Sequence, residues 1–354
     1  MSEQKLPLDS RPQPDLNQEQ LAQLNRLAQI QPERVETLQP HTPLGRTFLR
    51  ATNRILGGMR SSFRTTAEFI APDGSTDQEK DHLAANMLIA RLNDEVGMGA
   101  RFLAKSTGEA IGLKVNPESM QAIDEAVLFA ANEYGGAIIA TMHTGGLKAG
   151  TIELPDHLPS GSEIDMIVES AGDTIPKIAK GKAIVRAHTV GKPADLLQGP
   201  ANDSYDKAMH LLHAGEEQEV NARRIAAVRQ AVGNFKQDNE NGQFLLLAVD
   251  RPELAGSTVD VAQFNTVRRL PSSPAKLSAS TGRPVILVYP RITNGELHID
   301  VGEPIMATSR DSDSIQAATQ TLATQMEQLV RAHPDQWVVN RPIDEIWPYA
   351  KHEE

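Results

Sequence analysis

His143 has the position in this chain that most clearly suggests chemistry. It follows an apolar run, residues 137–142, and it precedes Gly145, Gly146 and Lys148. A short apolar run bounded by glycines predicts a buried strand. Open α/β sheets hold their ligand sites outside the carboxyl ends of such strands. His143 is therefore a candidate site residue, and this stretch alone leaves open a structural or solvent-exposed histidine.

Familiar cofactor and metal motifs do not occur in the sequence. There is no glycine-rich phosphate loop ending in Gly-Lys-Ser or Gly-Lys-Thr, and no Gly-x-Ser-x-Gly elbow. His210 and His213 stand three residues apart on a predicted helix, but no third metal ligand stands at a telling spacing. The chain has no cysteine, which excludes disulfides, thiolate metal sites and a cysteine nucleophile. We expect neither a metal nor an organic cofactor.

The overall charge and hydropathy limit the partners and the compartment. The formal net charge of −11 argues against general nucleic-acid binding. The N-terminal residues contain no apolar signal segment, and no run approaches the roughly 18 apolar residues of a membrane span. We expect a cytoplasmic protein that is soluble or bound peripherally at the inner membrane.

The first 70 residues form two segments of different composition. Residues 1–44 are rich in Gln, Pro and Asn, which predicts a mobile tail. Residues 45–70 form a basic amphipathic segment, in which five arginines between Arg46 and Arg64 fall on one helical arc and apolar residues on the other. Such a helix binds an anionic membrane surface or docks to a partner. A surface helix packed on the domain is an equal alternative.

Two helices are expected before the His143 strand. Thr76 stands at capping-box spacing from Glu79 and begins a long helix, which the glycines at 97 and 99 should kink or end. Asn116 and Pro117 begin the second helix, which should stop at the Gly-Gly pair 135–136.

Strands and helices alternate through the rest of the chain. Strands are predicted over 137–142, 164–169, 183–187, 244–250, 284–292 and 296–301, and helices over 208–212, 221–235, 272–280 and 313–332. Asn294-Gly295 is a strong hairpin signal. The alternation predicts an α/β fold with a mostly parallel central sheet and helices on both faces. We place this domain at 71–342 and a C-terminal tail at 343–354.

Four segments of the chain resemble a known family. They are the helix 116–134 with the following GGAIIATMHTGG, the stretch 224–250 that ends in FLLLAVD, the stretch 271–305 that contains TGRPVILVYPRITNG, and HPDQWVVNRP at 333–342. In this order and spacing they resemble the bacterial lipid A late acyltransferases. These are the lauroyl and myristoyl transferases of the lysophospholipid acyltransferase superfamily.

The resemblance implies a fold and a reaction. The fold is glycerolipid acyltransferase-like, with an N-terminal helical extension. The reaction moves an acyl group from acyl carrier protein or coenzyme A to a hydroxyl or amine of a lipid or small-molecule acceptor. A histidine takes the acceptor's proton, and His143 matches that base. Gly145, Gly146, Arg224 and Arg291 are candidate contacts to the substrate, its phosphate or the oxyanion.

One departure from the family affects the catalytic residues. The family has Asp or Glu five residues after the histidine, where this chain has Lys148. A second carboxylate could orient the ring instead, and Glu153, Asp250 and Glu169 are the candidates. Alternatively, His143 acts without an orienting acid, or the site has lapsed and the protein binds acyl groups or lipids, or serves as a scaffold. The pair His298 and Glu303 has the family spacing but lies in the wrong segment, so we treat it as chance.

Overall fold

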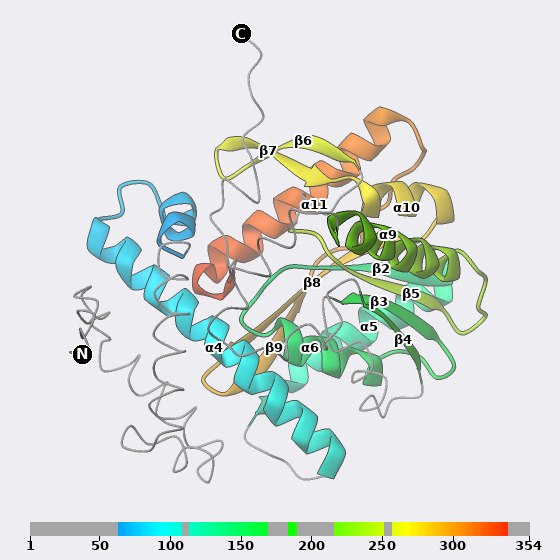
Figure 1. Cartoon of the computed structure of the whole chain (residues 1–354), viewed down its shortest axis with the longest axis horizontal. Coiled ribbons are helices and arrows are strands. Elements are labelled where there is room, and N and C mark those ends of the chain that lie inside the picture. Colours follow the sequence, from blue (N-terminus) through cyan, green and yellow to red (C-terminus); the bar gives the residue numbers. More distant parts are fainter. Residues whose placement is uncertain (1–62, 108–112, 169–182, 190–215, 251–256, 339–354) are drawn as a thin grey trace, which may run out of the picture.

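The computed structural model describes residues 63–107, 113–168, 183–189, 216–250 and 257–338, without the side chains of Leu92, 95–107, Val168, Thr189 and 216–224. Within these ranges the chain forms a central sheet with helices on both faces (Figure 1). The predicted α/β class is therefore confirmed. The tail, most of the basic segment, the histidines 210 and 213 and the C-terminal tail lie outside the described residues.

The main sheet has seven strands in the order β1-β9-β8-β2-β5-β3-β4. Strands β8, β2, β5, β3 and β4 are parallel, β9 is antiparallel to β8, and β1 is parallel to β9. Their bounds are β1 Lys114–Val115, β2 Gly136–Thr141, β3 Glu163–Val168, β4 Ile184–Thr189, β5 Gln243–Ala248, β8 Val285–Thr293 and β9 Glu296–Val301. The strand that leads to His143 is thus central, between β5 and β8.

Helices cover the two faces of this sheet unequally. On one face lie α9 (Glu216–Phe235), α10 (Ser273–Thr281) and α11 (Ser312–Ala332), and on the other lie α5 (Pro117–Tyr134) and α6 (Leu147–Glu153) (Figure 1). The long helix α4 (Asp77–Thr107) packs on α6 and on the short helix η4 (Pro334–Gln336). A second short helix, η1 (Leu154–Asp156), follows α6.

Alternation along β2 explains why the sheet has two apolar cores. Ile138 and Ala140 belong to the core under α9, α10 and α11, whereas Ala137 and Ile139 belong to the core under α5 and α6. Because successive strand side chains point to opposite faces, a strand buried on both faces must be apolar throughout. All six residues of β2 are buried.

Local signals set most helix boundaries as predicted. The Thr76 backbone N–H donates to Glu79 Oε2 at 2.7 Å, and the Glu79 N–H donates to Thr76 Oγ1 at 3.2 Å, which is the reciprocal capping box. Asn116 accepts from the Ser119 N–H at 3.0 Å, and Gly135 ends α5 in the left-handed conformation at φ 68°.

The helix does not end at Gly97 and Gly99, as one of the two expectations had it, because α4 continues from Asp77 to Thr107. Glycine in a helix interior costs about 1 kcal/mol relative to alanine. That cost is too small to end a helix of 31 residues whose first half packs on α6 and η4.

Two hairpins differ in how well the sequence predicted them. Asn294 and Gly295 have φ of 54° and 75°, as a two-residue hairpin turn requires, and they join β8 to the antiparallel β9 as predicted. A second hairpin of β6 (Thr258–Gln263) and β7 (Thr266–Pro271) was not expected. Its turn contains Phe264 and Asn265 at positive φ, without the glycine that usually signals such a turn.

Candidate active site

The site begins with the register between two central strands. Strand β2 pairs with β5 so that Gly136 stands beside Gln243 and Thr141 beside Ala248. Pairing continues one step further, because the Val249 N–H donates to the Thr141 carbonyl at 2.9 Å. Since the offset is constant, His143 and Asp250 follow the two carboxyl ends side by side, where open α/β sheets hold their ligands.

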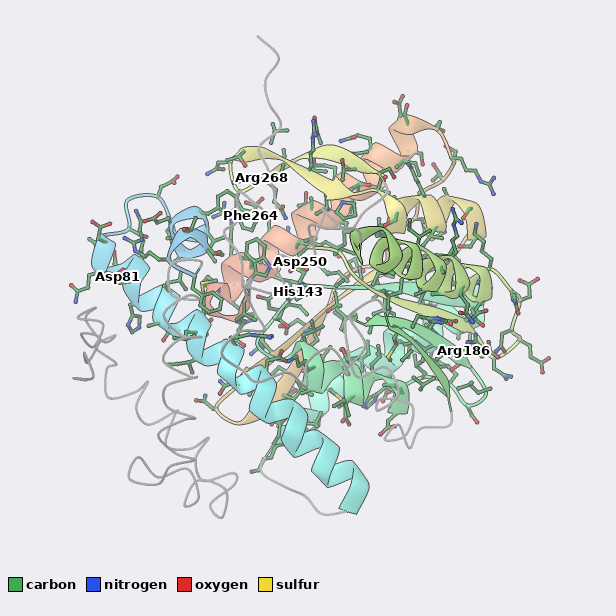
Figure 2. All side chains as sticks on the ribbon, viewed as in Figure 1. Asp81, His143, Arg186, Asp250, Phe264 and Arg268 are labelled. Carbon is green, nitrogen blue, oxygen red and sulfur yellow. The ribbon has the colours of Figure 1, made fainter. Side chains whose placement is uncertain are left out.

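His143 and Asp250 make two hydrogen bonds to each other. The imidazole Nδ1 lies 2.6 Å from Asp250 Oδ1, and the His143 backbone N–H donates to Asp250 Oδ2 at 2.7 Å. Figure 2 labels both residues near the centre of the molecule. The two bonds hold the imidazole and its own backbone to one carboxylate, so the ring has little freedom to turn away.

The Asp250 side chain is buried more completely than the His143 side chain. The Asp250 side chain is 0% exposed, whereas the His143 side chain is 19% exposed. Burial raises the pKa of the Asp250 carboxyl, but the charge of His143 and the hydrogen bonds from His143 and Trp337 outweigh it and lower that pKa below its usual value. The carboxylate is therefore ionised and inside the protein, while the imidazole still reaches solvent.

This geometry determines which ring nitrogen can act as a base. An ionised carboxylate only accepts hydrogen bonds, so Nδ1 carries the hydrogen that faces Asp250. In the neutral ring the lone pair then lies on Nε2. The arrangement can take a proton at Nε2 and stabilise the resulting imidazolium through Asp250, which is the chemistry of a general base.

A C-terminal segment that the sequence did not assign to the site contacts both His143 and Asp250. Trp337 bridges Thr144 in antiparallel fashion, the Val338 N–H donates to the His143 carbonyl at 2.8 Å, and the Gly145 N–H donates to the Gln336 carbonyl at 2.8 Å. The Trp337 indole N–H donates to Asp250 Oδ2 at 3.1 Å. The HPDQWVVNRP stretch was noted only for its resemblance, and no local signal in it predicts this contact.

The two candidate glycines are sites of close packing. A side chain at Gly145 would come within 2.7 Å of Ala90 Cβ, and one at Gly146 within 2.7 Å of the Arg291 backbone N. Both glycines are buried, and the Gly145 N–H is already committed to the Gln336 carbonyl. They bring the His143 loop into contact with α4 and β8.

Lys148 lies in the first turn of α6, a helix that the sequence reasoning did not predict. Its backbone N–H donates to Asp94 Oδ1 of α4 at 2.7 Å, and Arg91 binds the other oxygen of that buried carboxylate at 3.2 Å. An acid from α4 thus holds the start of α6, next to the position where the family has its own acid. The interaction is with the backbone of residue 148, so it does not depend on the lysine side chain.

Glu153 ends α6, and one contact of its carboxylate is with His157, at 3.8 Å from the ring Nε2. Glu169 lies outside the described residues. Of the two candidate carboxylates that the structure describes, Asp250 is the one within hydrogen-bond distance of the His143 ring.

Of the two arginines predicted to contact the substrate, the structure describes the side chain of Arg291 but not that of Arg224. Arg291 of β8 lies near the His143 loop, but its Nε donates to Asp300 Oδ2 across the β8–β9 hairpin at 2.8 Å. The Arg291 side chain is 15% exposed. Arg224 belongs to α9, and its side chain is not among those described.

A small pocket lies under α6, beside the strand that leads to His143. It is lined mainly by apolar side chains, namely Leu147, Leu154, Leu246, Val288, Pro290 and Ile299, with Thr141, Gly150 and Thr151. The Thr141 hydroxyl is buried there without a hydrogen-bond partner. Thr141 and Leu147 connect this pocket in sequence to the histidine loop.

The mostly parallel sheet, with the His143–Asp250 pair at its carboxyl edge, is an α/β fold consistent with that of the acyltransferases. Residues 208–341 match the family model of the bacterial lipid A biosynthesis acyltransferases. No curated protein matches the chain. The family match confirms the resemblance seen in the sequence and supports a general acyltransferase function. It includes Asp250, Arg291 and Trp337 and begins after His143, so the assignment of His143 rests on geometry.

Proposed function

We propose that the protein transfers an acyl group from a thioester donor to a hydroxyl or amine acceptor, with His143 as general base. The observation that carries this proposal is the 2.6 Å contact between His143 Nδ1 and Asp250 Oδ1. It supplies the orienting carboxylate that Lys148 removes from the family position. The family match supports the acyl-transfer class, and the donor is acyl carrier protein or acyl-coenzyme A.

The reaction follows from the positions of the nitrogens. His143 Nε2 takes the proton of the acceptor hydroxyl or amine as the acceptor atom attacks the thioester carbonyl carbon. The tetrahedral oxyanion collapses, the carbon–sulfur bond breaks, and the imidazolium returns the proton to the leaving thiolate. Asp250 stabilises the imidazolium between these two steps, and it stays ionised throughout.

The acceptor is a lipid or small molecule, and membrane attachment is a separate matter. Among the residues that the structure describes, no helix is long and apolar enough to cross a membrane. We propose that the basic segment 45–70, which lies mostly outside those residues, brings the protein to an anionic surface. Liposome co-sedimentation of the chain with and without that segment tests the idea, and equal pelleting would refute it.

The absence of cysteine makes a direct assay possible. A thiol reagent such as dithionitrobenzoate reports the released carrier thiol without any background from the protein. Lauroyl, myristoyl and palmitoyl donors on both carriers should be incubated with a panel of hydroxyl and amine acceptors. Acceptor-dependent thiol release that falls by about 10²- to 10⁴-fold in His143→Ala supports the proposal.

Two outcomes would contradict the proposed function. Turnover that His143→Ala leaves unchanged would refute the base assignment. Binding of acyl donors without thiol release for any acceptor would instead indicate an acyl-binding or scaffold protein that retains the fold.

A further inference from the structure

Asp250 has a third hydrogen-bond donor besides the two that His143 supplies. The Trp337 indole N–H is 3.1 Å from Asp250 Oδ2, and both side chains are fully buried. An indole N–H can only donate, and no change of pH in the working range removes its hydrogen. This contact therefore fixes Oδ2 as the oxygen that faces away from the imidazole ring.

The indole itself is held from two sides. The Trp337 backbone forms an antiparallel bridge with Thr144, the residue after His143. The bridge places the indole donor and the histidine side by side. The indole ring stacks on Phe264 with centroids 5.7 Å apart and planes inclined by 18°. Phe264 lies in the β6–β7 turn, where its backbone N–H donates to Glu327 of α11 at 2.9 Å. The indole therefore has a fixed position relative to the carboxylate.

We propose that Trp337 is a positioning residue that acts through Asp250 to keep His143 in the tautomer with a basic Nε2. The inference rests on the proposed role of His143 as base. Without the indole N–H, Oδ2 loses a buried donor that fixes its orientation, and the carboxylate can rotate away from Nδ1. The ring then loses the contact that keeps the hydrogen on Nδ1, and a share of the molecules carries it on Nε2, where it blocks proton abstraction.

The chain offers a matched pair of variants to test this inference. Trp337→Phe removes the N–H and keeps an aromatic ring for stacking. Phe264→Leu removes the stacking partner and keeps the N–H. If Trp337 only fills space, both variants should have the same effect, whereas a positioning role requires that only Trp337→Phe change the histidine ring.

Ring ¹⁵N chemical shifts of histidine-labelled full-length protein report the tautomer directly. The chain has ten histidines, and the His143→Ala spectrum assigns the signal. We expect the Nδ1–H form in the wild type and in Phe264→Leu, and a mixture of tautomers in Trp337→Phe. We also expect kcat for thiol release to fall about tenfold in Trp337→Phe, with KM within about twofold.

The outcomes separate this inference from the proposed function. Wild-type His143 shifts in Trp337→Phe would overturn the positioning role, even if His143-dependent turnover is found. Altered shifts would support the role even if no donor and acceptor react. If Trp337→Phe does not fold, site-specific benzothienylalanine at 337, which replaces the indole N–H by sulfur at nearly constant shape, gives the same comparison.

Discussion

His143 and Asp250 stand beside each other because β2 and β5 pair without a bulge, although 107 residues separate them in the chain. The carboxylate that contacts the proposed base comes from the end of the neighbouring strand and not from the helix after the histidine. The side chain at position 148 therefore need not be an acid. The contact that holds the start of α6 is made by the backbone N–H of Lys148 to Asp94.

The first prediction compares the two candidate acids that the structure describes, Asp250 and Glu153. Asp250→Asn should lower kcat of the proposed reaction by about 10²- to 10⁴-fold, because the amide cannot stabilise the imidazolium. Glu153→Gln should leave kcat nearly unchanged, since the carboxylate that contacts the His143 ring is that of Asp250 and Glu153 contacts His157. The thiol-release assay measures both. The reverse ranking would show that Glu153 is the orienting acid.

A second prediction concerns the packing of the histidine loop. Gly146→Ala should destabilise the protein by about 1–3 kcal/mol, because its Cβ would lie 2.7–2.9 Å from the Arg291 backbone. Gly233→Ala in α9 has nothing within 4 Å and should be stabilising by up to about 1 kcal/mol. Urea unfolding gives both values. Equal effects would mean that the loop shifts at little cost.

The third prediction is a pH dependence with a definite sign. Burial lowers the pKa of His157, but hydrogen bonds and charges of Glu153 and Asp124 outweigh it and raise that pKa above its usual value. The stabilisation is therefore present below about pH 6.5 and is lost as the pH rises through the folded-state pKa. Relative to the wild type, His157→Gln should lose more Tm at pH 5.5 than at pH 8.5.

His298 is the matched control for that experiment. Burial, followed by the charge of Arg291, lowers the pKa of His298. Protonation of His298 therefore favours the unfolded state, and it lowers the stability of the wild type at low pH. His298→Gln should gain relative to the wild type at pH 5.5. Parallel pH profiles for the two variants would contradict both assignments.

A fourth prediction concerns the polar cluster on β3 and β4, away from the site. The buried Asp165 accepts from Arg186 Nε at 3.1 Å, His188 at 2.5 Å, Asn234 at 2.9 Å and Gln243 at 3.1 Å. Asp165→Asn should cost about 3 kcal/mol, because it removes the buried charge that these side chains share and leaves Arg186 paired with Glu163.

The pH dependence of this cluster gives a further check. Burial raises the pKa of Asp165, but the hydrogen bonds from Arg186, Asn234 and His188 outweigh it and lower that pKa. The advantage over Asp165→Asn is therefore present above about pH 4 and shrinks as the pH falls through the folded-state pKa. The exposed pair of Asp260 and Arg269, 3.4 Å apart, is the control, and Asp260→Asn should change stability by less than about 1 kcal/mol.

Local signals in the sequence predicted the elements well. The Thr76 capping box, the Asn116 cap and the Asn294-Gly295 turn depend on contacts within a few residues, so their residue types alone indicate them. The β6–β7 hairpin was missed because its turn has no glycine at the positions with positive φ. The helix α6 was missed because its seven residues include a glycine and form little of a periodic pattern.

The candidate site could be predicted only in part, because its contacts cross the sheet. The sequence predicted that His143 and Asp250 both lie at strand ends. It did not indicate that these two strands are neighbours in the sheet. Trp337 lies 87 positions after Asp250, beyond α11, so no local pattern in the sequence indicates their contact. Gly145 and Gly146 looked like a substrate-binding turn, whereas the space they leave is taken by α4 and β8.

The pairing of β2 with β5 also has a kinetic consequence. The two strands meet only after the intervening chain has closed a long loop, and such non-local pairing is slow compared with helix formation. The Trp337 indole reaches Asp250 only once that loop is closed. In a Trp347→Phe background, which leaves Trp337 as the one tryptophan of the sequence, the fluorescence of Trp337 during refolding reports when the proposed base and its carboxylate have come together. An early intermediate with its helices formed would still lack the site.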